Sequence, residues 1–224
     1  MKFLKMLSFS VALILAATAV KADYDVTEFK DGHGHKTTLL GWDGSSHIIQ
    51  LGSNVYTISA SSVGVGSTTD AKFTFNVTLT SGTTPGSITY AVYDNSTYGP
   101  FAAPPTGEQT VLTTTVSGFS GRDAITATGD FAPTDLSPDT SNQAKSVGPD
   151  TVSTVLDGGD ISGAGTFNLA FLKGNASWGT VGHTLTSVTE VHNVATPEPA
   201  SMLIGLVGIP CMGGLVRMAR RRKA

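Results

Sequence analysis

Cysteine is almost absent from this sequence: of 224 residues only Cys211 is one, and it lies in a hydrophobic stretch near the C-terminus. No disulfide is therefore expected to stabilise the rest of the chain. Basic residues are scarce as well, since residues 23–196 contain six of them against sixteen acidic residues, a formal charge of −10. Binding to nucleic acid depends on Lys and Arg displacing counterions from phosphate, so we do not expect this region to bind it.

Sequence motifs of catalysis are also missing. The chain has no Gly-x-Ser-x-Gly elbow, no His-Glu-x-x-His pair, no phosphate-binding glycine loop and no cysteine in residues 23–196. A glycosidase needs only two carboxylates that can be remote in sequence, so that class stays open. The sequence favours a protein that is not an enzyme.

The N-terminus has the three parts of a secretory signal peptide. Two lysines precede an apolar run over residues 6–20, which is short for a membrane span, and Val20-Lys21-Ala22 then places small residues at a cleavage site. The pattern predicts a signal peptide over residues 1–22, removed by signal peptidase between Ala22 and Asp23, with cleavage after Ala19 as an alternative.

The C-terminus combines a short motif, an apolar segment and a basic cluster. The motif is Pro197-Glu198-Pro199, and residues 200–216 follow without a charge. As a helix rising about 1.5 Å per residue, these seventeen residues would extend roughly 26 Å, just short of a hydrocarbon core. Positive charge after the span should remain cytoplasmic. The basic residues are Arg217, Arg220, Arg221, Arg222 and Lys223.

This order of three parts resembles the PEP-CTERM sorting signal of Gram-negative bacteria. The resemblance covers residues 197–224 and implies recognition by exosortase, a membrane protease that cleaves near the motif. It also implies an inner-membrane-anchored precursor, release or attachment to the cell envelope, and association with extracellular polysaccharide and biofilm matrix. Similar tails occur on proteins described as ice-binding. An ordinary single-span membrane anchor is the alternative.

Between the two ends the pattern is that of β-strands. In Phe73–Thr80 every second side chain is apolar, which predicts a half-buried strand. Turn residues follow, and Ile88–Tyr93 is expected to return as its hairpin partner. A loss of alternation near Thr186-Ser187 suggests a bulge. Proline-containing loops are expected at 99–107 and 133–150. Further strands are expected at 47–51, 55–60, 110–116, 124–131, 151–156, 167–172 and 183–194.

About nine short strands and no helix of three turns predict one all-β domain over residues 23–196, an antiparallel two-sheet sandwich resembling a jelly roll. The order of the strands cannot be deduced from the sequence. We see no internal repeat that would indicate a solenoid.

Metal sites have only weak support in the sequence. His33 and His35 could hold zinc or copper if His47 supplied a third ligand, but two histidines beside a glycine are usually solvated. Calcium remains an alternative cofactor, because its oxygen ligands often come from acidic turns. No complete twelve-residue calcium loop is present, and we expect no cofactor. The acidic turns are Asp43-Gly44, Asp94-Asn95 and Asp157-Gly158-Gly159-Asp160.

The function predicted from the sequence is therefore that of an exported, non-enzymatic protein of the cell surface or extracellular matrix. A glycan-binding module is the alternative, in which exposed aromatic rings stack on sugars. An ice-binding protein with flat threonine arrays is a further one. The aromatic candidates are Trp42, Trp178, Tyr93 and Tyr98, and the threonine arrays are 113–115, 126–128 and 184–186.

Overall fold

The computed structural model describes Tyr24 and residues 26–63, 71–101, 106–132, 144–148, 152–156 and 165–195. Every regular element in these residues is a strand. Fourteen strands are present: β1 Val26–Lys30, β2 Lys36–Leu39, β3 His47–Leu51, β4 Asn54–Val63, β5 Ala71–Ser81, β6 Gly86–Asp94, β7 Tyr98–Phe101, β8 Glu108–Ser117, β9 Ala124–Ala132, β10 Ala144–Val147, β11 Val152–Leu156, β12 Gly165–Phe167, β13 Leu169–Trp178 and β14 Thr184–Ala195.

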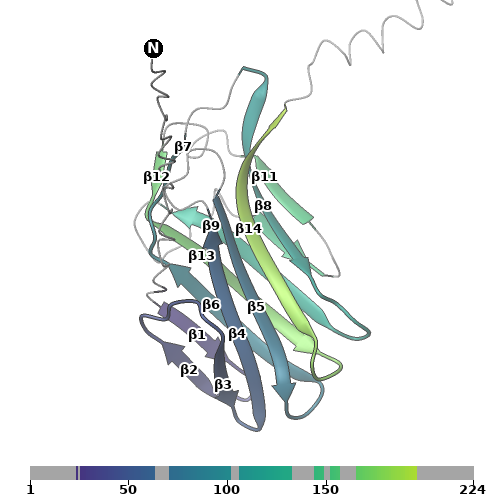
Figure 1. Ribbon diagram of the computed structural model, residues 1–224. Coiled ribbons are helices and arrows are strands. Elements are labelled where there is room, and N and C mark those ends of the chain that lie inside the picture. The colour runs from purple at the N-terminus through teal and green to yellow at the C-terminus, as the bar shows by residue number, and fades with distance from the viewer. Residues whose placement is uncertain are drawn as a thin grey trace, which may run out of the picture.

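Two six-stranded antiparallel sheets pack face to face, as the sequence predicts (Figure 1). Sheet 1 has the strand order β10-β9-β13-β6-β1-β2, and sheet 2 has the order β11-β8-β14-β5-β4-β3. A short pair, β12 and β7, lies beside them. The all-β, two-sheet prediction is confirmed.

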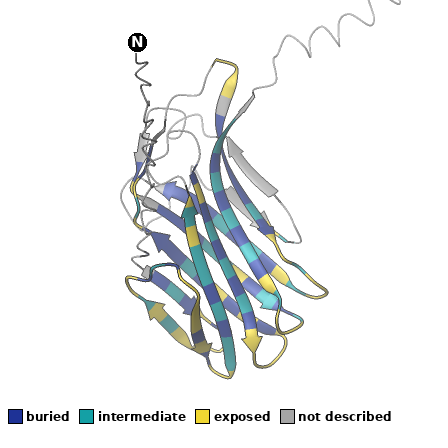
Figure 2. Cartoon of the chain, in the orientation of Figure 1, coloured by how far each residue is buried: buried dark blue, intermediate teal, exposed yellow. Residues whose placement is uncertain are grey.

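Strand β5 shows why the sandwich forms. Phe73, Phe75, Val77 and Leu79 are fully buried, whereas the residues between them are of intermediate burial (Figure 2). The Phe75 ring contacts Tyr90 of sheet 1 with 4.6 Å between ring centroids. Because each strand contributes every second side chain to the space between the sheets, the apolar core forms one continuous cluster.

The predicted hairpin between β5 and β6 is wrong. Strand β5 pairs with β4 and β14 in sheet 2, and β6 pairs with β1 and β13 in sheet 1. Residues 82–85 therefore cross from one sheet to the other. Alternation shows that a segment is a strand with one buried face. It does not show whether the next strand pairs beside it in the same sheet or lies across the core in the other sheet.

The predicted bulge in the last strand is also wrong. Strand β14 pairs with β5 from Thr184 to Val191 without a register shift. Ser187 and Thr189 interrupt the apolar pattern while their side chains still point inward and are fully buried. The irregularity in this sheet lies instead between Val55 and Tyr56 of β4.

The inward hydroxyls of β14 have partners inside the core. Tyr90 Oη donates to Ser187 Oγ at 2.9 Å across the two sheets. Thr189 Oγ1 lies 2.8 Å from Thr114 Oγ1 of the adjacent strand β8. Both pairs satisfy groups whose burial without a partner would be costly.

Two glycines of sheet 1 make room for these hydroxyls. A Cβ at Gly174 would lie 2.5 Å from Tyr90 Oη, and one at Gly129 would overlap the Thr189 side chain. Close approach of the opposite sheet therefore requires glycine at position 129, whereas Gly174 leaves space for Tyr90 and for the Thr126 carbonyl oxygen within sheet 1.

Other expectations are changed in detail. The run 167–172 is divided, because β12 ends at Phe167 and β13 begins at Leu169. The expected loop 133–150 contains strand β10, which pairs with β9, and the expected loop 99–107 contains most of β7. Strands β1 and β2 were not predicted and form an edge of sheet 1.

The first and last described residues lie at the same end of the sandwich. The Tyr24 ring stacks on Phe73 near the start of β5, with 5.7 Å between centroids. Val191 pairs with Ala71 at that same end of β5, and β14 continues beyond it to Ala195. The turns around Asp31, Asp123 and His183 lie at the opposite end.

Candidate functional site

The outer side of sheet 1 carries an unusual concentration of basic residues. Two cross-strand rows define what we call the lysine face. One row runs from β1 to β9 through Glu28, Ala91, Lys173 and Thr128. The second row runs parallel to it through Lys30, Thr89, Asn175 and Thr126.

A shallow trough crosses this face. Three hollows, with volumes of about 420, 360 and 310 Å³, are all lined by Thr89. The first reaches Lys36 on β2, and the other two extend to Thr126 on β9. Strands in a sheet lie roughly 4.8 Å apart, so the trough extends roughly 19 Å from β2 to β9. It is open and elongated rather than enclosed.

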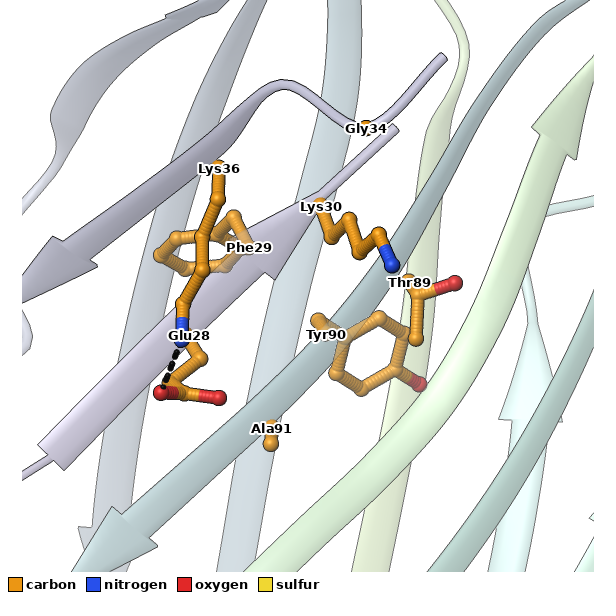
Figure 3. A pocket seen from close by; sticks show the side chains of 8 residues that line it. All are labelled: Glu28, Phe29, Lys30, Gly34, Lys36, Thr89, Tyr90 and Ala91. Atoms are coloured by element: carbon orange, nitrogen blue, oxygen red, sulfur yellow. Dashed lines mark hydrogen bonds and ion pairs between the residues drawn. The ribbon is translucent and has the colours of Figure 1, made fainter. Parts of the chain in front are cut away.

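The lysines lie at both sides of the trough. The exposed Lys30 side chain extends over β6 toward Thr89 (Figure 3). Lys173 lies on the other side, with its Nζ 5.0 Å from the ring centroid of Tyr93 and 5.2 Å from that of Phe171. Cation–π contacts of this kind hold an ammonium group in place without neutralising it.

The described acidic groups on the lysine face form no ion pair with Lys30 or Lys173. Glu28 Oε1 accepts a hydrogen bond from Lys36 Nζ at 2.6 Å (Figure 3). Asp130 is fully buried beside Phe171 and lines none of the three hollows. Within the described residues, no carboxylate lies at ion-pair distance from Lys30 or Lys173.

Beside the lysines, the floor of the trough offers neutral hydrogen-bonding groups. Thr89 Oγ1 donates to Asn175 Oδ1 at 2.7 Å, which fixes the amide and leaves its NH₂ group directed elsewhere. Both side chains are exposed, and Ala91 beside them is small. A bound molecule would therefore meet hydroxyl and amide groups flanked by two ammonium groups.

Residues singled out as aromatic sugar platforms are not available for stacking. Trp178 and Tyr98 are fully buried, Trp42 is 6% exposed and Tyr93 is 9% exposed. Trp178 donates from Nε1 to the His183 carbonyl, and Trp42 does the same to Ser45, both at 2.9 Å. The aromatic form of the glycan-binding prediction is therefore wrong, because three of these rings fill the core and the fourth, Tyr93, is covered on the outer side of sheet 1, where it packs against Phe171.

The expected threonine arrays are divided between opposite faces. Thr126 belongs to the lysine face, whereas Thr184 and Thr186 lie on the outer side of sheet 2. There the hydroxyls bond one another: Thr184 Oγ1 lies 2.7 Å from Thr78 Oγ1, and Thr186 donates to Asn76 at 2.8 Å. These residues form cross-strand pairs within the sheet.

The histidines belong to structural turns. Asp31 Oδ1 accepts from the backbone of His33 and His35, and Oδ2 lies 2.6 Å from His35 Nδ1. Burial raises the pKa of Asp31, but these hydrogen bonds outweigh burial and lower it below its usual value. No three metal-ligand side chains are grouped in the described part of the chain, and His47 does not join this pair.

Asp123 and His183 repeat this arrangement between two other turns. Asp123 Oδ2 lies 2.7 Å from His183 Nδ1, and its carboxylate accepts from the backbone of Gly179 and Ser120. Burial raises the pKa of Asp123, and the bonds from His183 and the two amides bring it below the usual value. The carboxylate joins the β8–β9 loop to the β13–β14 loop at one end of the sandwich.

Asp94 of the predicted acidic turn is a buried hydrogen-bond acceptor. Tyr98 Oη donates to Oδ2 at 2.6 Å, Ser62 also donates to this oxygen, and Ser96 N donates to Oδ1. Burial, followed by the adjacent Asp94 charge, raises the pKa of Tyr98 far above its usual range, so the phenol stays a donor. These donors occupy the oxygens that calcium would need.

The predicted sorting and processing residues lie outside the described residues. They include Ala22 and Asp23, the motif 197–199 and the basic cluster 217–223, together with the calcium candidate 157–160. None of the described segments forms a helix capable of crossing a membrane, and the expected span 200–216 is not among those segments.

No family model matches the chain, and no curated protein matches it. Among solved structures, the chain is similar to the enzymatically active domain of tailspike protein 4 of bacteriophage CBA120, with 12% sequence identity and a TM-score of 0.29. The matched part covers 62% of this chain and 19% of the tailspike chain. A similarity of this extent carries no argument about function.

The lysine face was not found by sequence analysis. The available signal was the scarcity of bases, since Lys30, Lys36 and Lys173 are half of the six between residues 23 and 196. Their convergence depends on the order of strands in sheet 1, which alternation does not determine.

Proposed function

We propose that this chain is an exported, non-enzymatic protein of the cell envelope or extracellular matrix that adheres to polysaccharide. Residues 1–22 direct secretion, residues 23–196 form the adhesive sandwich, and residues 197–224 are a sorting signal for exosortase. The precursor is held in the inner membrane before processing. Support for export comes from the sequence of the two ends, which agree on the side of the membrane at which the sandwich lies.

The trough on the lysine face is the observation that supports adhesion. It is long, shallow and lined by exposed hydroxyl and amide groups, which suits a polymer with many hydroxyl groups better than a small substrate. The buried carboxylates Asp31, Asp94 and Asp123 each accept several hydrogen bonds from the fold, which supports a structural use of these groups.

Export and sorting are tested by intact-mass and C-terminal peptide analysis of the protein recovered from its native envelope. We expect a chain that begins at Asp23 and ends near Pro199. A chain that still contains Arg220 and the residues after it would indicate a plain membrane anchor, and would exclude the proposed sorting.

Adhesion is tested by affinity electrophoresis of the purified full-length chain, in mild detergent, through gels containing the polysaccharide of the producing cells. Retardation is expected, and Asn175→Ala should reduce it several-fold because the floor of the trough loses its amide. Thr74→Ala, on the outer side of sheet 2, is the matched control and should leave retardation unchanged. Unretarded migration of the wild-type chain would contradict the adhesive function.

A further inference from the structure

We propose that the trough of the lysine face selects acidic polysaccharides, meaning sugar chains that carry carboxylate or sulfate groups, and that Lys30 and Lys173 bind those groups. This inference rests on the proposed adhesive function and specifies its ligand class. It starts from a contrast of charge, because residues 23–196 are strongly acidic while the accessible charges along the trough are mainly positive.

The contrast has a physical consequence for an anionic chain. Elsewhere the domain repels a polyanion, so productive encounters are directed to the lysine face, where two lysines unpaired within the described residues flank a hollow. A hollow on the outer side of sheet 2 is lined by both Lys72 and Glu190. Lys72, on the outer side of sheet 2, is already 3.5 Å from the Glu190 carboxylate. Lys36 is likewise bonded to Glu28, which leaves Lys30 and Lys173 as the ammonium groups at the trough without a carboxylate partner in the described residues.

The positions of the two lysines suit an extended ligand. Lys30 lies on β1 and Lys173 on β13, with β6 between them, so roughly 10 Å separates the two strands. A chain lying across the strands would pass Lys30, then Thr89 on β6, and then Asn175, with Lys173 two residues from Asn175 on β13. Acidic groups on separate sugars would meet Lys30 and Lys173, while sugar hydroxyls would bond the Thr89 and Asn175 side chains.

A lysine ammonium group can bind more than one kind of acidic group. Lysine is a compact point charge without the planar fork of arginine, so it accepts both carboxylate and sulfate. No arginine lines the three hollows. The ligand class is therefore defined by charge and sugar hydroxyls together rather than by one acidic group.

The test compares three probes on the purified full-length chain: polygalacturonate, which is a uronate polymer, neutral dextran, and double-stranded DNA of similar length. We expect polygalacturonate to bind most tightly, with affinity decreasing as salt is added. Lys30→Gln and Lys173→Gln should each weaken this binding by about 3- to 10-fold, the usual size of one charge-assisted contact, with dextran binding unchanged.

Lys72→Gln is the matched control, since it removes the same charge from the opposite face. Thermal unfolding of each variant verifies that the fold is retained. Equal binding of polygalacturonate and dextran would overturn the selection of acidic chains while leaving the adhesive function in place. Equal weakening by Lys72→Gln would overturn the site, and DNA binding as tight as polygalacturonate would identify a general polyanion surface instead. Binding to neither polysaccharide would overturn the selection of acidic chains, whereas the adhesive function would fall only if the chain also migrated unretarded through the polysaccharide of the producing cells.

Discussion

At the scale of single residues, several hydroxyl groups lie inside the core at positions where alternation of the sequence predicts apolar side chains. The Tyr90–Ser187 hydrogen bond joins the two sheets where an apolar pair would be expected. Tyr90→Phe or Ser187→Ala should each cost about 1–3 kcal/mol, because either change leaves one buried hydroxyl unpaired. Urea unfolding measures the loss. The double variant should lose less than the sum of the two single variants, whereas simple additivity would contradict the coupling.

Gly129 gives a steric prediction at the same scale. Its missing side chain admits Thr189 from the opposite sheet, so Gly129→Ala should destabilise the protein by about 1–3 kcal/mol through overpacking. Gly32→Ala is the control, since the nearest atom to its new Cβ would be Ser87 Oγ at 3.5 Å. Equal unfolding midpoints for the two variants would show that the sheets do not approach as closely at Gly129.

The Asp123 carboxylate predicts an acid-dependent loss of stability. Its pKa is lower in the folded state than in the unfolded chain, where it is about 3.9. The stabilisation is therefore present above about pH 4 and is lost as the pH falls through the folded pKa. Asp123→Asn should have a lower unfolding midpoint than the wild type at pH 7 and should lose less between pH 7 and pH 3. Glu108→Gln, at the exposed start of β8, should follow the wild type.

At the scale of elements, strand β5 allows the alternation to be tested directly. Phe75→Ala should cost about 3–5 kcal/mol, because the ring is fully buried between Phe29 and Tyr90. Thr74→Ala, one residue earlier on the outer face, should change the free energy of unfolding by less than about 0.5 kcal/mol. Chemical denaturation of both variants provides the comparison, and similar costs would contradict the assignment of faces.

The elements also show how much of the fold could be predicted. The long strands were predicted because local alternation is determined by burial, and β3 was predicted with its observed bounds. Pairing could not be predicted, since residues 82–85 connect different sheets while their turn chemistry would equally suit a hairpin. The lysine face depends on that pairing: Lys30 and Lys173 are far apart in sequence, and only the order β13-β6-β1 brings them to one trough.

At the scale of the whole molecule, the crossing connections predict cooperative unfolding. Trp42 contacts Tyr24 at the end where the described chain begins, and Trp178 contacts Tyr56 at the opposite end. Because one continuous core joins these ends, tryptophan fluorescence and far-UV circular dichroism should give coincident unfolding curves. Single-tryptophan variants, Trp42→Phe and Trp178→Phe, allow each end to be followed separately. Different midpoints for fluorescence and circular dichroism in either variant would indicate independent parts.

The described chain begins and finishes at the same end of the sandwich, and its strands run away from that end. If the molecule is held at the C-terminal side, as proposed, a polymer crossing the strands of sheet 1 lies parallel to the supporting surface rather than pointing away from it. One polymer can then pass through the troughs of several neighbouring copies. Weak individual contacts would combine through a high effective concentration, so avidity rather than single-site affinity would set the strength of attachment.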